Sequence, residues 1–354
     1  MRLLFTLLHL YIGVRLLPPL APWAQAIGLA MLLASLWLIP KAWWIPKAGP
    51  RTVMARWISM GFFSWLFVLT VVRDVALLFV DGWQAESALA VLAATPIITA
   101  IGFLMARRVA RVVEVRVPVE RLHASLDGFT IAQISDVHVG PTIKREFVER
   151  IVERVNGLQA DVVAITGDLV DGSVKQLARH TAPLANLRSR HGTYVVTGNH
   201  EYYSGANAWI EELERLGAHV LMNEHVMIDH DGAPLALAGV TDFSAHHFDA
   251  SHKSDPGLAL RGAPDEAVKV LLAHQPRSAP SAEAAGYDLQ LSGHTHGGQF
   301  WPWNLFVRFS QPFTAGLHRL GRMQVYISRG TGYWGPPMRF GIPSEITRIR
   351  LVRA

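Results

Sequence analysis

Apolar side chains dominate the first 106 of the 354 residues, where they occur in four long runs at 3–24, 24–40, 58–80 and 88–106. A helix needs roughly 20 apolar residues, with a range near 17–25, to cross the hydrocarbon core of a bilayer. The sequence therefore predicts an all-α transmembrane region of about four helices over residues 1–106. Two or three helices are the alternative count. A cleaved signal peptide is the alternative for the first run, although Ala21-Pro22-Trp23 is a poor cleavage site.

Basic residues in the connecting segments favour one orientation of these helices. Lys and Arg are enriched in the cytoplasmic loops of membrane proteins. The segments after the second and fourth runs are basic, whereas those after the first and third runs carry no Lys or Arg. We therefore expect an integral membrane protein with both termini and the C-terminal region on the cytoplasmic side. The basic residues are Lys41, Lys47, Arg51, Arg56, Arg107, Arg108 and Arg111.

The uneven distribution of charge and histidine separates the chain into two parts. The first 116 residues hold 11 basic and four acidic side chains, and the remaining residues hold 22 basic and 24 acidic ones. A basic patch for nucleic acid is therefore not expected on the C-terminal part. Cysteine is absent, which excludes disulfides, Cys-ligated zinc and a Cys nucleophile. Fifteen of the 16 histidines follow residue 117, which indicates metal or acid–base chemistry there.

Three ionisable residues interrupt the apolar runs, namely Arg15, Arg73 and Asp74. Ionisable groups inside a membrane are candidates for function, and they also pair with one another or reach the interface. We expect snorkelling or pairing between helices. Adjacent residues on a helix do not face each other, so Arg73 and Asp74 are expected to have other partners.

Beyond residue 127, short apolar runs alternate with stretches of helical spacing, which is typical of an α/β domain with helix-covered sheets. We expect a basic linker over 107–126 and a single α/β domain over 127–354. Strands are predicted at 129–135, 162–166, 193–197, 235–240, 268–273, 289–292, 324–328 and 346–351, and helices at 144–158, 174–187 and 206–216.

Polar residues directly follow five of these strands. Ligands of α/β sheets bind at the carboxyl ends of strands, and Asp, Asn and His suit Mn²⁺, Fe²⁺ or Zn²⁺. Each cluster alone is typical of an ordinary turn, but five at strand ends predict a metal site. The clusters are Asp136-Val137-His138, Gly167-Asp168, Gly198-Asn199-His200-Glu201, His274 and Gly293-His294-Thr295-His296-Gly297.

In this order the five clusters closely resemble the signature of the calcineurin-like metallophosphoesterase superfamily, D-x-H, G-D, G-N-H-[DE], H and G-H-x-H. The resemblance covers about 127–352 and implies a four-layer sandwich of two mixed β-sheets flanked by helices. The GHTHGGQ segment at 293–299 and residues 328–346 resemble a branch of membrane-linked or exported bacterial phosphodiesterases, which implies a protein of the bacterial inner membrane.

The resemblance also implies a role for each matching residue. His200 is expected beside the scissile phosphate, as the catalytic acid or hydrogen-bond donor, without binding metal. Two divalent ions (Mn²⁺, Fe²⁺ or Zn²⁺) are expected, one held by Asp136, His138 and His296, the other by Asn199, His274 and His294, with Asp168 bridging both.

Other residues near these motifs give weaker signals. Asp171, Asp242 and the pair His246-His247 lie in loops after strands, where solvated side chains are expected. Asp242 and Trp301 are nevertheless the candidates for substrate contact. Trp301 belongs to an aromatic segment at 300–306, which either lines a groove for an acyl chain or packs as a cap on the sheet.

These observations favour a membrane-anchored, metal-dependent phosphoesterase. Its expected substrate is a phosphodiester or pyrophosphate, with a lipid-linked or envelope-precursor compound as the first interpretation, and membrane lipids as further partners. A soluble phosphoester, such as a cyclic nucleotide or a phosphoprotein, is the alternative substrate. A membrane-anchored binding or sensor protein with little catalysis is the alternative class.

Overall fold

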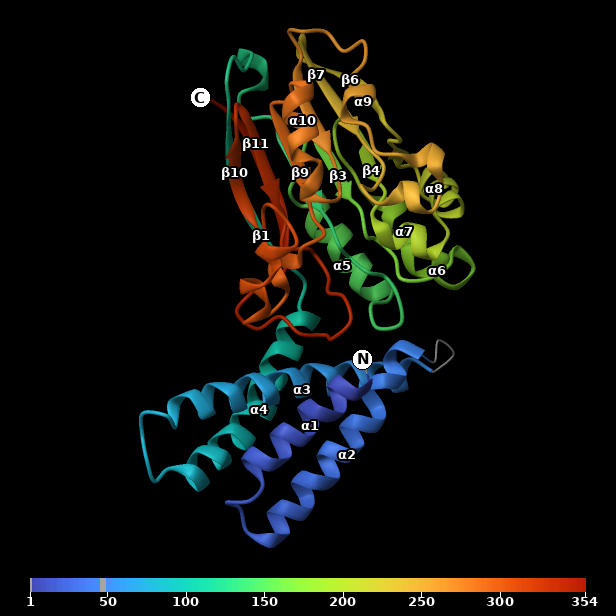
Figure 1. Ribbon diagram of the computed structural model, residues 1–354. Helices are drawn as coiled ribbons and strands as arrows, with labels where there is room; N and C mark the ends of the chain where they lie inside the picture. The colour runs from blue at the N-terminus through green and yellow to red at the C-terminus, as the bar shows by residue number, and fades with distance from the viewer. Residues whose placement is uncertain (1, 45–48) are drawn as a thin grey trace. The chain divides into compact units, whose positions relative to one another are not determined.

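The computed structural model describes residues 2–44 and 49–354 of the chain (Figure 1). Lys47, part of the predicted basic loop, lies outside the described residues. The chain forms two compact units by its internal contacts. The helical unit comprises Met1–Arg107 and Gly335–Phe340, and the α/β unit comprises Arg108–Trp334 and Gly341–Ala354.

Four helices form the described part of the first 107 residues, namely α1 (Arg2–Leu16), α2 (Pro22–Trp44), α3 (Pro50–Ala76) and α4 (Gln84–Arg107). Among the described residues, α2, α3 and α4 are long and apolar enough to cross a membrane. With 15 residues, α1 is about 22 Å long, which is short of the roughly 30 Å hydrocarbon core. The expected region of about four spanning helices therefore has three of spanning length and one shorter apolar helix.

Asp74 lies at the centre of a polar network in the helical unit. The Tyr11 hydroxyl donates to it at 2.6 Å, Arg15 Nε at 2.7 Å and Arg73 Nη1 at 2.9 Å. Arg73 also donates through Nε to the Ser87 hydroxyl at 2.9 Å. Both residues have other partners, as expected, but they also pair with each other, which their adjacent positions in the helix did not indicate. Pairing between helices satisfies these charges, as an apolar surrounding requires.

Two mixed sheets form the α/β unit, each with six strands in the described chain (Figure 1). The first sheet has the order β1-β12-β2-β3-β4-β5, with β1 (Arg111–Val119), β12 (Glu345–Arg353), β2 (Thr130–Ile134), β3 (Val162–Thr166), β4 (Thr193–Val196) and β5 (His219–Val220). The second has the order β10-β11-β9-β8-β7-β6, with β10 (Gly316–Leu320), β11 (Met323–Ile327), β9 (Leu289–Ser292), β8 (Val268–Leu272), β7 (Ala233–Gly239) and β6 (Glu224–His230). Strands β2 to β5 run parallel, as do β11, β9, β8 and β7.

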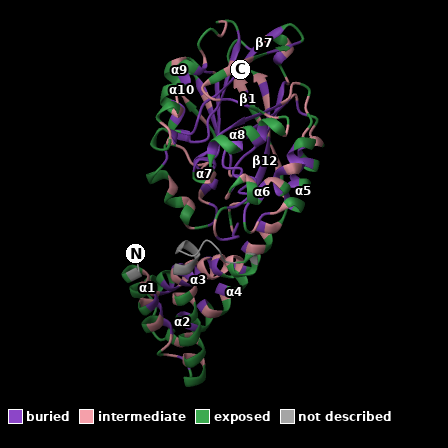
Figure 2. Cartoon of the chain, turned by 90° about the vertical axis from the view of Figure 1, so that its right-hand side faces the viewer, coloured by how far each residue is buried: buried purple, intermediate pink, exposed green. Residues whose placement is uncertain are grey.

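Helices flank the two sheets and give the sandwich its outer layers. Figure 2 shows that the strands are largely buried, whereas the outward sides of the helices are exposed. Ala279 and Ala282 of α10 pack with Leu271 of β8 and Val325 of β11 on the outer face of the second sheet. The helices of this unit are α5 (Arg145–Asn156), α6 (Val174–Thr181), α7 (Asn199–Ser204), α8 (Ala206–Arg215), α9 (Pro256–Ala259) and α10 (Ala279–Ala285).

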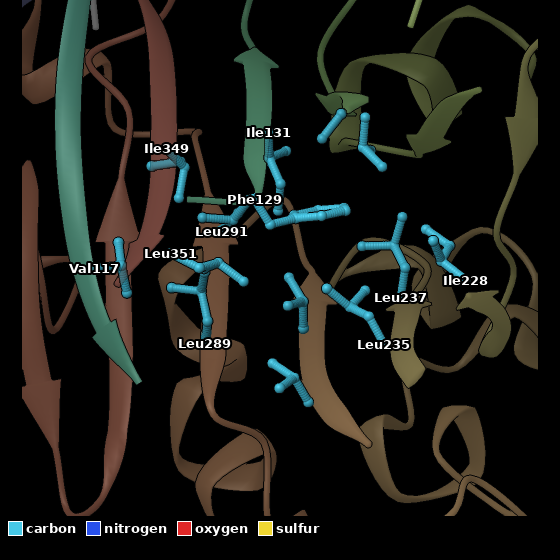
Figure 3. Packing of buried hydrophobic residues seen from close by; sticks show 14 of the residues in the cluster. Val117, Phe129, Ile131, Ile228, Leu235, Leu237, Leu289, Leu291, Ile349 and Leu351 are labelled. Atoms are coloured by element: carbon cyan, nitrogen blue, oxygen red, sulfur yellow. The ribbon is translucent and has the colours of Figure 1, made fainter. Parts of the chain in front are cut away.

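The main core of the α/β unit lies between the two sheets. Side chains such as Ile131 and Ile349 of the first sheet point toward Leu235, Leu237 and Leu291 of the second (Figure 3). All five are fully buried. Burying one such side chain stabilises the fold by about 1.5–3 kcal/mol, so polar residues at the strand ends can change without unfolding the unit.

The expected basic linker over 107–126 is in part a strand of the sandwich. Residues Arg111–Val119 form β1, which pairs in parallel with β12 along its whole length. From Val113 to Val117 its valines alternate with Glu114 and Arg116, so one side of the strand faces the core while the other stays exposed. The linker prediction was wrong here because the charges of an edge strand resemble those of a loop.

Candidate metal centre

All five predicted polar clusters lie at the carboxyl ends of central strands. Asp136 and His138 follow β2, and Asp168 follows β3. Asn199 and His200 open α7 directly after β4. The second sheet contributes His274 after β8, and His294 and His296 after β9. The structure thus brings together all eight residues that the sequence placed at the metal site.

One group of ligand atoms is formed by Asp136, His138 and His296. The Nε2 atoms of the two histidines are 3.1 Å apart, and His296 Nε2 lies 3.5 Å from Asp136 Oδ1. His138 Nδ1 lies 3.0 Å from the Asp171 carboxylate, to which it donates in the neutral tautomer. Its Nε2 lone pair then faces His296, and a cation between the two rings suits this arrangement.

A second group is formed by Asp168, His274 and His294. Asp168 Oδ2 lies 3.1 Å from His274 Nε2, and His294 Nδ1 lies 3.2 Å from the same nitrogen. Burial and the neighbouring His274 lower the pKa of His294 to about 3. His294 is therefore neutral at physiological pH and offers a lone pair to a metal.

Asn199 shows a further sign of a missing partner. Its side-chain Oδ1 is buried and has no hydrogen-bond partner in the described structure. A buried amide oxygen without a partner costs about 1–3 kcal/mol, and coordination of a divalent ion removes that cost. The donor set of carboxylate, amide and imidazole groups fits Mn²⁺, Fe²⁺ or Zn²⁺.

The backbone at the strand ends is strained, as it often is at functional sites. Five candidate ligands adopt the left-handed conformation, with φ between 50° and 70°. This region is uncommon for residues other than glycine, and each such residue costs of order 1–3 kcal/mol. The fold holds the side chains in this conformation, which turns them toward one point. The five are Asp136, His138, Asp168, His294 and His296.

His200 forms a hydrogen-bonded pair with Asp171 at the edge of the metal centre. His200 Nδ1 donates to Asp171 Oδ1 at 2.6 Å, and His200 Nε2 lies 3.9 Å from Asp168. Burial lowers the pKa of His200, but the hydrogen bond to Asp171 and the charges of Asp168 and Asp171 outweigh this effect and raise it to about 9. His200 therefore carries a proton on Nδ1, which the Asp171 carboxylate accepts, and its ring lies beside the metal ligands.

Asp171 contributes to the site in a way that the sequence did not indicate. It was expected to be a solvated loop residue, but its Oδ1 accepts from Nδ1 of both His138 and His200. Burial raises the pKa of Asp171, but the charges and hydrogen bonds of these two histidines lower it to about 2. Asp171 is therefore ionised and orients both rings.

Glu201 is the second residue whose role at the site its motif did not indicate. Its buried carboxylate accepts from the backbone N–H groups of Asp168 at 2.9 Å, Leu169 at 2.7 Å and Gly198 at 2.6 Å. Burial and the charge of Asp168 raise the pKa of Glu201 to about 7. Glu201 joins the loops after β3 and β4. Its place in the Gly-Asn-His-Glu cluster was the available signal.

Asp242 and Trp301, the two candidates for substrate contact, lie in different surroundings. Asp242 is fully buried, and its carboxylate accepts from Gln275 Nε2 at 3.0 Å and from the Ser244 N–H at 2.8 Å. It therefore supports the loop around His274 and presents no free carboxylate to a substrate. Trp301 is 39% exposed and follows the GHTHGGQ segment.

The two mixed sheets and the clustered ligands define a class of divalent-metal-dependent phosphoester hydrolases, and comparison with known proteins agrees. The family described as "Calcineurin-like phosphoesterase" matches residues 129–298. "Transmembrane protein with metallophosphoesterase domain" from Danio rerio is 36% identical over 326 residues, covering 84% of this chain and 75% of that protein. This chain therefore belongs to the calcineurin-like metallophosphoesterase family.

Further similar proteins come from bacteria as well as animals. An uncharacterized metallophosphoesterase of Helicobacter pylori (strain ATCC 700392 / 26695) is 42% identical, covering 63% of this chain and 59% of that protein. A solved 5'-nucleotidase precursor from Thermus thermophilus is 16% identical with a TM-score of 0.41, covering 59% of this chain and 49% of that one. The matched part spans 62% of the bovine relative. Because the relatives include vertebrate proteins, the similarity reaches beyond a bacterial branch.

Proposed function

We propose that this protein is a membrane-anchored, dinuclear-metal-dependent phosphohydrolase that cleaves a phosphodiester or pyrophosphate bond. The position of Asp168 is the observation that carries this proposal. Its Oδ2 lies 3.1 Å from His274 in one group of ligands and 3.9 Å from His138 in the other. A carboxylate within reach of both groups suits a pair of ions about 3.5–4 Å apart.

The residues of the proposed centre either bind the metal ions, contact the phosphoryl group or orient a neighbouring side chain. Divalent ions bound there supply positive charge that offsets the negative phosphoryl oxygens. His200 donates a hydrogen bond to a phosphoryl oxygen or a proton to the leaving group, while Asp171 holds its ring in place. The proposed ligands are Asp136, His138 and His296 for one ion, and Asn199, His274 and His294 for the other, with Asp168 shared.

Exposed aromatic residues near the site support a lipid-linked substrate. Residues 301–309 follow the GHTHGGQ segment and expose Trp301 (39%), Trp303 (38%), Phe306 (54%) and Phe309 (76%). Exposed apolar surface of this kind is typical of binding sites for apolar ligands or lipid. A phosphodiester or pyrophosphate that carries an acyl chain fits both the metal centre and this surface.

We place the α/β unit on the cytoplasmic side of the cell membrane, and this orientation does not depend on α1. Lys47 lies between α2 and α3, with Lys41 near the end of α2 and Arg51 and Arg56 near the start of α3. Asp81 lies between α3 and α4, and Glu86 lies in the first turn of α4. Arg107, Arg108 and Arg111 lie at or just after the end of α4. Three spanning helices therefore satisfy the positive-inside rule as well as four do. The number of spans decides only where the N-terminus lies.

The test uses the full chain, purified in detergent and loaded with Mn²⁺. We expect it to hydrolyse bis(p-nitrophenyl) phosphate, and to hydrolyse a phospholipid diester in mixed micelles with a higher kcat/KM. Turnover of cyclic nucleotides or phosphoproteins in preference to the lipid would favour a soluble substrate. Bound metal without turnover of any phosphoester would favour a binding or sensor protein.

A further inference from the structure

Two exposed aromatic side chains lie close to the proposed catalytic histidine in the α/β unit. His200 and Tyr203 belong to the same helix, α7, and are three residues apart, so their side chains are neighbours on its surface. Their ring centroids are 5.1 Å apart, with an angle of 63° between the ring planes. The Phe248 ring lies 5.5 Å from that of Tyr203. We call Tyr203 and Phe248 the aromatic pair.

Buried neighbours hold the aromatic pair in place. Tyr202 is 8% exposed and packs against Phe248, with 5.8 Å between ring centroids. The Tyr202 hydroxyl donates to His252 Nδ1 at 3.0 Å, and the Thr241 hydroxyl donates to the His252 carbonyl at 2.8 Å. These contacts join α7 to the segment after β7 that carries Phe248. The arrangement of the two rings is therefore built into the fold.

Both rings of the aromatic pair are nevertheless open to solvent. Tyr203 is 62% exposed and Phe248 is 53% exposed. Single exposed apolar residues are common on protein surfaces, but adjacent ones mark binding sites for ligands or partners. The aromatic pair is therefore a candidate binding surface next to His200.

A third aromatic residue of the α/β unit also contacts His200. The Trp334 ring lies 5.8 Å from the His200 ring, with an angle of 75° between the planes, and Trp334 is 38% exposed. Gln299 fixes Trp334, because its Oε1 accepts from the Trp334 N–H and its Nε2 donates to the Trp334 carbonyl, each at 2.9 Å. A group that reaches His200 thus meets aromatic surface from two separate segments of the chain.

The position and openness of the aromatic pair indicate what it binds. His200 is proposed to contact a phosphoryl oxygen or the leaving oxygen, and either role brings a substituent of the phosphate close to its ring. Since more than half of each ring is exposed, the pair offers an open face instead of an enclosed groove. A flat ring can stack on such a face, whereas ligands with apolar chains are held in concave surroundings that bury most of their surface.

We propose that Tyr203 and Phe248 form a subsite for a flat aromatic ring, carried by the phosphate substituent that lies nearest to His200. The substrate then has an aryl or nucleobase-like group on this substituent, and the acyl chain proposed for the surface at 301–309 belongs to the other one. This inference rests on the proposed phosphohydrolase function and adds the chemical class of one substituent. All the contacts that support it lie within the α/β unit.

The experiment compares two competitive inhibitors of the full chain in detergent, loaded with Mn²⁺ and assayed with bis(p-nitrophenyl) phosphate. Phenylphosphonate carries a flat ring, and cyclohexylphosphonate carries a puckered ring with the same number of carbon atoms. Tyr203→Leu removes the aromatic ring but keeps an apolar side chain. Pairing of aromatic rings adds about 2- to 12-fold in affinity beyond the area that is buried. The Ki of phenylphosphonate should therefore rise by this factor relative to that of cyclohexylphosphonate, with bound metal unchanged.

Two further variants keep the result interpretable. Tyr203→Phe is the matched control, because it keeps the ring and should retain the wild-type ratio of the two Ki values. Phe248→Leu should shift the ratio in the same direction as Tyr203→Leu, and it decides the question if Tyr203→Leu fails to fold. An unchanged ratio, including equal weakening of both inhibitors, would overturn the inference and leave the rings as packing around His200. A wild-type protein that does not hydrolyse bis(p-nitrophenyl) phosphate would instead overturn the proposed function.

Discussion

Replacing Asp171 by Asn tests whether this carboxylate orients the two histidines that it contacts. The Asp171 carboxylate accepts hydrogen bonds from His200 Nδ1 at 2.6 Å and from His138 Nδ1 at 3.0 Å. The change to Asn keeps the shape of the side chain but removes its negative charge. A hydrogen bond to a charged group contributes about 1.5–3 kcal/mol. Loss of the His200 bond in the transition state therefore predicts a fall in kcat of roughly 10- to 150-fold.

The His138 bond predicts a second, separable effect. Outer-shell partners of metal-ligating histidines typically contribute about 10- to 100-fold to metal affinity or activity, so Asp171→Asn should also weaken metal binding. The assay measures kcat at saturating Mn²⁺ and, separately, the Mn²⁺ concentration for half-maximal activity. Asp231→Asn is the control, since it removes the same charge from an exposed pair with Arg190. Unchanged kcat at saturating metal in Asp171→Asn would refute the reasoning.

Three further predictions concern the site, the membrane and the substrate. Asp168→Asn should lower bound metal and turnover together by orders of magnitude while the unit stays folded, as elemental analysis and circular dichroism would show. His200→Ala should keep its metal and lose roughly 10²–10⁴ in kcat; loss of metal would make His200 a ligand. Replacing Trp301 and Trp303 by Ala should slow hydrolysis of a bilayer-embedded diester more than that of bis(p-nitrophenyl) phosphate, and equal losses would make these residues part of the core.

The central strands and the polar clusters could be predicted because their signals are local. A buried parallel strand is a continuous apolar run, as in Val162–Thr166 and Leu289–Ser292, and its end is marked by the polar residue that follows. Because parallel strands bring their carboxyl ends to one edge, clusters distant in the sequence meet. The order of the strands in each sheet has no comparable local signal.

Edge strands were missed because half of their residues face solvent. The strand β6 (Glu224–His230) mixes charged and apolar residues, and β5 has only two residues. The expected strands at 129–135 and 346–351, in contrast, correspond to β2 and β12 in the interior of the first sheet. Burial on both faces, rather than strand propensity, separates the elements that were found from those that were missed.

Residues that support the site carry even less local information. Asp171 and Glu201 differ from solvated carboxylates only through partners at distant positions, such as His138 for Asp171 and Asp168 for Glu201. Each binds groups from two strand ends at once. Since such a carboxylate holds two loops together, its role becomes visible only when the strands have been placed side by side.

The glycines of the helical unit show the same limit. Gly61 and Gly102 lie in apolar helices, where glycine weakens the helix by about 1 kcal/mol relative to alanine. Nothing in the surrounding sequence indicates a compensating contact, since their shared neighbour Met338 is more than 200 residues away in the chain. Glycine at both positions is explained because a Cβ atom there would overlap the Met338 side chain.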